Sequence, residues 1–154
     1  MNRIEYLNFH HVDPDDFLAI LNEDALRKHL IDHAYFDSDS IKEWMEDKVK
    51  IGSLTGCRIK AVYIEGALAG WCGIQPDENG FEMAIVLSKK FWGFGIEIFK
   101  TLMCWARELG HEEILFHLLD SRPEYKALRK MANRVQKTKL LGRVFTTYYI
   151  SVSN

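Results

Sequence analysis

The segment Lys90-Phe91-Trp92-Gly93-Phe94-Gly95 has the residue types of a phosphate-binding turn. It lies between an apolar run ending at Leu87-Ser88 and a helical pattern that begins near Ile96. The first N–H groups of a helix have no partner within the helix and carry the positive end of its dipole, so they bind anions. Gly93 and Gly95 allow a positive φ and a close approach to a pyrophosphate, and Lys90 adds a cation. An ordinary strand-to-helix turn is the alternative interpretation.

The glycine spacing does not fit the two common nucleotide-binding motifs. A dinucleotide fingerprint requires a third glycine, and a P-loop requires Gly-Lys-Ser/Thr, and the sequence after Gly95 supplies neither. The turn also follows several predicted antiparallel strands, whereas nucleotide-binding folds usually begin with such a turn. The pattern therefore argues against a dinucleotide-binding or P-loop fold and leaves both interpretations of the turn open.

The elements around the turn can be predicted from hydrophobic period and from turn residues. Predicted strands cover 3–9, 57–65, 67–74, 81–87 and 114–119, with two more between 139 and 152 about Gly142. Predicted helices begin at Asp13-Pro14 and cover 25–33, 41–49, 95–109 and 123–135. This succession predicts an α/β (α+β) fold with a mixed, mostly antiparallel central sheet of about six to seven strands and helices on both faces.

The composition is that of an ordinary globular chain, with 47% hydrophobic and 27% charged residues among 154. We expect a single domain over residues 1–154. The absence of an apolar run of the length needed for a membrane helix predicts a cytoplasmic protein without a membrane partner. The three cysteines lack paired short spacing, so the sequence predicts neither a disulfide framework nor a metal site.

Charge is distributed unevenly along the chain. Residues 1–50 contain twelve acids and six bases, whereas residues 120–154 contain two acids and eight bases. Two solvated faces would explain this pattern. The alternative is an acidic rim for a cationic substrate and a basic rim for a polyanionic cofactor. Nucleic acid is not a favoured partner.

Residues Glu82 to Glu97, with the sequence EMAIVLSKKFWGFGIE, resemble the acetyl-CoA-binding segment of the GNAT superfamily of N-acetyltransferases. The Trp92-Gly93-x-Gly95 form resembles the branch that acetylates ribosomal proteins and small amines. The sequence match is confined to about residues 81–110, whereas the element order agrees over nearly the whole chain. The resemblance implies a GNAT-like acyl-CoA N-acyltransferase fold, acetyl-CoA as co-substrate, and direct acyl transfer to a primary amine in a ternary complex.

The resemblance also implies which residues bind the cofactor: Val86, Leu87, Ser88, Lys90, Phe91, Trp92, Gly93, Phe94, Gly95 and Ile96. The family begins this turn with Arg or Gln, so Lys90 keeps the charge of Arg but lacks its planar donors. In the family a bulge in the preceding strand supplies an N–H group to the oxyanion. We expect the backbone near Val86 and Leu87 to do so here, with their side chains packing on the pantetheine arm. A plain buried strand is the alternative.

Glu82 and Tyr125 are the predicted catalytic residues. A primary amine is mostly protonated at neutral pH, so a base must accept a proton, and family members often place a carboxylate at the position of Glu82. Relatives use an asparagine and a tyrosine where this chain has Arg122 and Arg129, so those roles do not carry over. Tyr125 is the nearest replacement for the acid that protonates the thiolate. A solvent-facing Glu82 and a core-edge Tyr125 are the structural alternatives.

The acceptor is predicted to be a small-molecule amine or a peptide or protein amine, bound where the acids around 32–39 meet the turn near Gly142. His117 could point toward the cofactor cleft, but a hydrogen-bonded core histidine is the simpler interpretation. A non-catalytic acyl-CoA-binding or regulatory protein is the competing function. A homodimer is compatible with the sequence.

Overall fold

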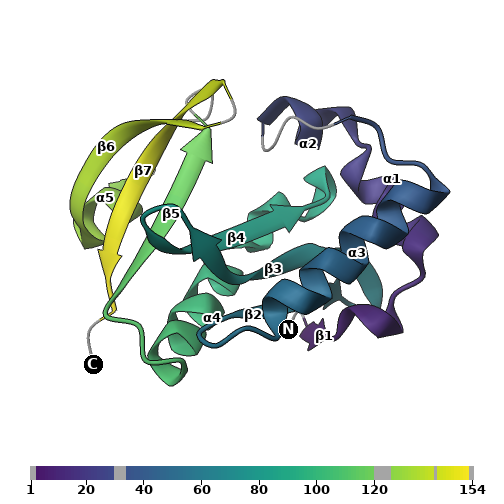
Figure 1. Ribbon diagram of the computed structural model, residues 1–154, viewed down its shortest axis with the longest axis horizontal. Coiled ribbons are helices and arrows are strands. Elements are labelled where there is room, and N and C mark those ends of the chain that lie inside the picture. The colour runs from purple at the N-terminus through teal and green to yellow at the C-terminus, as the bar shows by residue number, and fades with distance from the viewer. Residues whose placement is uncertain (1–2, 30–33, 120–125, 141, 153–154) are drawn as a thin grey trace.

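Figure 1 shows the computed structural model, in which one twisted sheet carries helices on both faces. The structure describes residues 3–29, 34–119, 126–140 and 142–152. The seven strands have the order β1-β2-β3-β4-β5-β7-β6, and only β4 and β5 are parallel. The expected mixed, mostly antiparallel sheet is confirmed.

The strands are β1 (Ile4–Leu7), β2 (Arg58–Ile64), β3 (Ala67–Asp77), β4 (Gly80–Leu87), β5 (Glu113–Leu119), β6 (Ala132–Leu140) and β7 (Arg143–Ser151). The α-helices are α1 (Pro14–Leu21), α2 (Asp24–His29), α3 (Ser38–Gly52), α4 (Gly95–Glu108) and α5 (Lys126–Met131). Two 3-10 helices, η1 (Phe9–His11) and η2 (Lys89–Phe94), complete the described elements. None of the described helices has the length and apolar run needed to cross a membrane.

Side-chain alternation along the strands builds one core on each face of the sheet. On one face, α1 and α3 pack with Trp71 of β3 and Val86 of β4. On the other face, α4 packs with Met83 and Leu87 of β4 and with residues of β2, β5 and β7. Glu82 and Val86 are separated by an even number of positions in β4, so their side chains project from the same face of the sheet, which α1 and α3 cover.

The hairpin between β2 and β3 turns at Glu65 and Gly66, as the sequence predicted. Both residues have positive φ, 52° and 81°, which is the geometry of a two-residue hairpin turn that matches the strand twist. Farther along β3, the register with β2 shifts, and Gly70 has a φ of 156°. A Cβ at this position would lie 1.9 Å from the carbonyl oxygen of Val86, so only glycine allows β4 to approach here.

Strand β3 is longer than the sequence predicted. Gln75 and Pro76 were expected to end it, but β3 continues to Asp77, which pairs with Gly80 across a two-residue turn. The backbone of Pro76 faces away from β4, and β2 has already ended, since its first residue Arg58 pairs with Ile74. The missing N–H of proline therefore costs no ladder hydrogen bond, and Asp77 is held in a strand.

Two further boundaries differ from the prediction. Strand β1 ends at Leu7, because Phe9 turns into η1 and is buried there. The predicted helix over 123–135 is wrong beyond Met131, where β6 begins and pairs with β7. A register shift between Ala132 and Arg134 breaks the alternation of β6, so its apolar spacing is not that of a regular strand.

Candidate active site

Strands β4 and β5 separate shortly after they meet. Their only described pairs are Glu82 with Leu115 and Met83 with Phe116, and Figure 1 shows the two strands diverging beyond this point. On the other side of β4, the Ser88 N–H donates to the Ala69 carbonyl at 2.7 Å. Antiparallel hydrogen bonds recur at every second residue, so the N–H groups of Ile85 and Leu87 point to the side that β5 has left.

The sequence expectation of a bulge in β4 is wrong. Pairing with β3 runs without a shift from Gly80 opposite Asp77 to Leu87 opposite Gly70, and the shift lies instead between β2 and β3. Val86 packs in the α1 and α3 core and Leu87 in the α4 core, on opposite faces. The divergence of β5, and not a bulge, is what turns backbone N–H groups of β4 toward a free side of the strand.

The turn after β4 is a 3-10 helix that leads directly into the 14-residue helix α4. The indole N–H of Trp92 donates to the Leu87 carbonyl at 2.8 Å and so fastens the turn to the end of β4. The expected positive φ is not found: Gly95 has a φ of −57°, and Gly93 is not among the residues with positive φ. A Cβ at either glycine would meet no atom within 4 Å. Neither backbone conformation nor packing requires these glycines, whereas a ligand lying on the turn would use the open space.

Charged and apolar side chains surround the turn. Lys89 and Lys90 are exposed, and the Lys90 ammonium lies 5.2 Å from the centre of the Phe91 ring. Ile96 is 65% exposed although it is apolar. Glu97, in the first turn of α4, is also exposed and places a negative charge at the helix end that an anion would approach. The lysines favour a polyanion here, and Glu97 opposes it.

A carboxylate from another element holds the start of the turn. The Ser88 hydroxyl donates to one oxygen of Glu23 at 2.7 Å, and the Lys89 N–H donates to the other at 3.2 Å. Glu23 lies between α1 and α2, so this contact ties the N-terminal helices to the turn. Ser88 is buried, and Glu23 satisfies its hydroxyl.

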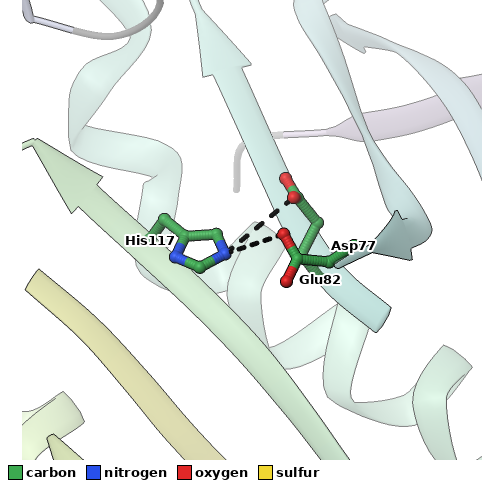
Figure 2. Close-up of side chains that lie close together, drawn as sticks. All are labelled: Asp77, Glu82 and His117. Atoms are coloured by element: carbon green, nitrogen blue, oxygen red, sulfur yellow. Dashed lines mark hydrogen bonds and ion pairs between the residues drawn. The ribbon is translucent and has the colours of Figure 1, made fainter. Parts of the chain in front are cut away.

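Glu82 lies in a cluster with Asp77 of β3 and His117 of β5, shown in Figure 2. The Nε2 atom of His117 is 3.1 Å from Asp77 Oδ1 and 4.0 Å from Glu82 Oε2. The side chains of His117 and Asp77 are 7% exposed and that of Glu82 is 22% exposed. One carboxylate oxygen from each acid and one ring nitrogen of the histidine all lie within 4.8 Å of one another. Hydrogen bonds and ion pairs join these side chains, and we interpret the cluster as an acid–base group.

The two carboxyl groups have pKa values displaced in opposite directions. Burial raises the pKa of Glu82 to about 7, and the hydrogen bond to Asp77 and the charge of Asp77 add to the rise. Burial also acts to raise the pKa of Asp77, but hydrogen bonds from the Asn79 N–H and from Glu82, with the influence of His117, hold it below its usual value. Glu82 therefore still carries a proton at pH values at which Asp77 is already ionised.

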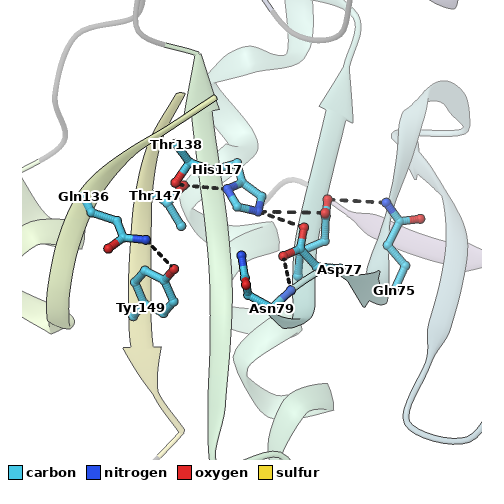
Figure 3. Close-up of polar contacts among 9 residues, drawn as sticks. Gln75, Asp77, Asn79, His117, Gln136, Thr138, Thr147 and Tyr149 are labelled. Carbon is cyan, nitrogen blue, oxygen red and sulfur yellow. Dashed lines mark hydrogen bonds and ion pairs between the residues drawn. The ribbon is translucent and has the colours of Figure 1, made fainter. Parts of the chain in front are cut away.

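A wider polar network continues the cluster across the sheet, as Figure 3 shows. The Gln75 amide donates to Glu82 at 3.4 Å and accepts from the Lys48 ammonium at 2.8 Å. Burial lowers the pKa of Lys48, which lies 4.6 Å from the centre of the Trp71 ring, and the charge of Glu82 opposes this change. On the other side, His117 Nδ1 lies 2.7 Å from the Thr147 hydroxyl.

The sequence placed Glu82 correctly on the strand that leads into the turn, but it did not identify Asp77 as a site residue and left His117 as a core histidine. Asp77 was assigned to a turn, and its place depends on β3 continuing past Pro76. The alternation in β5 puts His117 on the face opposite Phe116, which could have indicated its direction. Tyr125 and Arg122 lie outside the described residues, as does Asp32, while Arg129 lies in α5.

Known proteins resemble this chain in their solved structures, but no protein-family model and no curated protein matches its sequence. Among solved structures, an acetyltransferase from Agrobacterium tumefaciens has a TM-score of 0.72 and 12% identity, with 96% of this chain and 90% of that chain covered. A GNAT-family acetyltransferase from Streptococcus pneumoniae has a TM-score of 0.65 and 16% identity over 98% and 100% of the two chains.

A third structure is the Salmonella typhimurium protein yncA, described as an acetyltransferase and crystallised with its cofactor acetyl-CoA. Its TM-score is 0.64 at 13% identity, with 100% of this chain and 95% of that chain covered. The three alignments cover between 96% and 100% of this chain. The protein therefore has the fold of the GNAT-family acetyltransferases.

Proposed function

We propose that the protein transfers an acetyl group, or a related acyl group, from coenzyme A to a primary amine. The observation that carries the proposal is the position of Glu82. This carboxyl group, with a pKa of about 7, lies where β4 leaves β5, on the strand that ends in the open glycine turn. A base with a pKa near the working pH is the group that amine acylation needs.

The residues present fit coenzyme A. Coenzyme A would supply the acyl group as an activated thioester. The turn offers the N-terminus of α4, two exposed lysines and open space over Gly93 and Gly95 for phosphates. The N–H groups of Ile85 and Leu87 point to the side of β4 where an oxyanion could be stabilised. Glu82 would accept the proton of the amine, and Tyr125 remains our proposed acid for the leaving thiolate.

The solved structures support the cofactor, because yncA has the same fold and was crystallised with acetyl-CoA. The acceptor would be a small-molecule amine or an amine of a peptide or protein. It would arrive mostly as an ammonium ion, since the amine of a lysine side chain has a pKa of about 10.4. The ionised Asp77 beside Glu82 favours a cation at this place.

The proposal is tested by the release of free thiol from acetyl-CoA in the presence of a panel of amines, peptides and aminoglycosides. We expect thiol release that depends on one class of acceptor. Glu82→Gln should lower kcat/KM by roughly 10²-fold or more, since a positioned base contributes about 10²–10⁴-fold. Glu78→Gln, an exposed acid in the adjacent β3–β4 turn, is the matched control. An undiminished rate in Glu82→Gln would remove Glu82 from the mechanism.

Binding is tested separately by thermal unfolding with acetyl-CoA. At about a hundred times its dissociation constant, the ligand should add about 2.7 kcal/mol of stability. Gly93→Ala should leave the stability of the free protein unchanged, because a Cβ there meets nothing within 4 Å, but should weaken this ligand effect. Binding without turnover for any acceptor would favour the non-catalytic acyl-CoA-binding protein. No stabilisation by acetyl-CoA would contradict both functions.

A further inference from the structure

We infer that Asp77, Glu82 and His117 form one acid–base unit, in which Glu82 takes the proton of the acceptor and His117 receives a proton from the Asp77–Glu82 carboxyl pair. His117 is then a relay residue and not only a packed core histidine. The inference rests on the proposed function, because it concerns how the base of that reaction returns to its ionised form.

The stoichiometry of amine acylation requires such a return. An ammonium ion and a thioester give an amide, a thiol and one free proton. The new N–C bond replaces the C–S bond, the sulfur keeps the electron pair and takes one of the N–H protons, and a second N–H proton leaves the site. Glu82 must therefore pass on one proton in each turnover. With an acceptor lying over its partly exposed carboxyl group, a protein group beside it offers the direct route.

The hydrogen bonds of His117 fix which of its nitrogen atoms can accept that proton. The Thr147 hydroxyl donates to the Thr138 hydroxyl at 2.8 Å, so its oxygen is left to accept from His117 Nδ1 at 2.7 Å. This places the hydrogen of the neutral imidazole on Nδ1. Nε2, 3.1 Å from Asp77 Oδ1, is then the atom that accepts the relayed proton, and the contact becomes a hydrogen bond from Nε2–H to the ionised Asp77. Figure 3 shows His117 between Thr147 and Asp77 in this arrangement.

The charges around Glu82 favour transfer toward His117. Among the described residues, the charged or titratable groups that interact with it are Asp77 from β3, His117 from β5 and Lys48 from α3, and Lys48 reaches it through Gln75. An imidazolium that forms beside Asp77 is stabilised by that carboxylate. Lys48 favours the ionised form of Glu82 from the opposite side. A proton held on His117 therefore leaves Glu82 ready for the next acceptor.

The tautomer can be tested without any substrate, by nitrogen-15 NMR of the histidine rings, with His117→Gln used to assign the signals. We expect His117 to carry its hydrogen on Nδ1 at high pH. Thr147→Val removes the acceptor and should move the hydrogen to Nε2, whereas Thr147→Ser keeps the hydroxyl and should restore the Nδ1 form. A hydrogen on Nε2 in the unmodified protein would overturn the inference, whatever its enzymatic activity.

The catalytic role is tested by the pH dependence of kcat/KM with the acceptor found in the thiol assay. Asp77→Asn removes the neighbouring negative charge, so the acid limb of the profile should move to lower pH by about one unit or more, while the plateau falls. His117→Gln and Thr147→Val should each lower the plateau at least tenfold, with KM for acetyl-CoA unchanged, and Thr147→Ser should recover most of the rate.

Glu78→Gln is the control variant for these profiles, because it changes an exposed acid in the adjacent turn. Circular dichroism of each variant shows whether it is folded. Wild-type plateaus and an unmoved acid limb in folded Asp77→Asn and His117→Gln would overturn the relay while leaving the acyltransferase function intact. Absence of thiol release in the unmodified protein would instead contradict the proposed function, and the NMR result would stand apart from it.

Discussion

At the scale of single residues, the ionised carboxylate of Glu82 lowers the stability of the folded protein above neutral pH. Its pKa is raised from 4.5 to about 7, chiefly by burial. A raised pKa means that the folded state binds the proton more tightly, so the stability from this group is complete below pH 4.5 and is lost as the pH rises to 7. A base poised for catalysis therefore costs folding free energy under the conditions in which it works.

Glu82→Gln should accordingly be more stable than the unmodified protein at pH 8, by about 1–3 kcal/mol, since one pKa unit corresponds to about 1.4 kcal/mol. The difference should vanish below pH 4.5, where Glu82 is neutral in both states. Urea unfolding at pH 4, 6 and 8 measures the change, with Glu78→Gln as the control for loss of an exposed charge. Equal or lower stability of Glu82→Gln at pH 8 would show that burial and Asp77 do not destabilise the ionised form of Glu82.

Glu97 should weaken coenzyme binding. It is an exposed acid in the first turn of α4, where it favours the helix dipole but repels phosphate. Glu97→Gln should tighten acetyl-CoA binding by about two- to fivefold, as expected for a surface charge worth about 0.3–1 kcal/mol. Glu112→Gln, beyond the opposite end of the same helix, should leave the affinity unchanged. Titration calorimetry decides the point, and a weaker affinity in Glu97→Gln would contradict it.

At the scale of elements, the tether from Glu23 joins the N-terminal helices to the start of the turn. Glu23→Ala should leave the buried Ser88 hydroxyl and the Lys89 N–H without this acceptor, at a cost of about 1–3 kcal/mol locally. Hydrogen exchange of the Lys89 amide should become about tenfold faster, since about 1.4 kcal/mol corresponds to a factor of ten. Asp24→Asn, the adjacent acid, is the control. Unchanged exchange at Lys89 in Glu23→Ala would exclude a tether at this position.

At the scale of the whole molecule, only two described pairs of residues join β4 to β5, but a shared core joins the two parts of the sheet. The core on the α4 face contains side chains from β2, β3 and β4 on one side of the divergence and from β5 and β7 on the other. Helix α4 lies over both parts, so unfolding of one part exposes the apolar surface of the other. The opening at the site therefore need not divide the protein into separate folding units.

Leu102→Ala should confirm this cooperativity. Leu102 is fully buried in α4, so the cavity should cost about 2–5 kcal/mol. Unfolding should remain a single transition, with tryptophan fluorescence and far-ultraviolet circular dichroism coinciding. Ile96→Ala, in the same helix but 65% exposed, should change stability by less than about 0.5 kcal/mol. Two resolved transitions in Leu102→Ala would show that the parts of the sheet unfold independently.

The sequence by itself determined the elements whose signals are local. Glu65-Gly66 fixed a hairpin, Asp13-Pro14 began a helix, and the apolar run over 81–87 placed Glu82 on the strand before the glycine turn. Backbone preferences and side-chain period act over a few residues, so neighbouring residues are enough to reveal them.

The tertiary structure decided what depends on distant partners. Asp77 became a strand residue because β2 had ended beside Pro76, and β6 replaced a predicted helix because β7 was available to pair with it. The raised pKa of Glu82 arises from burial and from Asp77 and requires the fold to bring the two carboxyl groups together. His117 joins them from 35 positions farther along the chain, through the parallel pairing of β4 and β5. No local pattern specifies that encounter, because it depends on where the separate strands meet in the folded sheet.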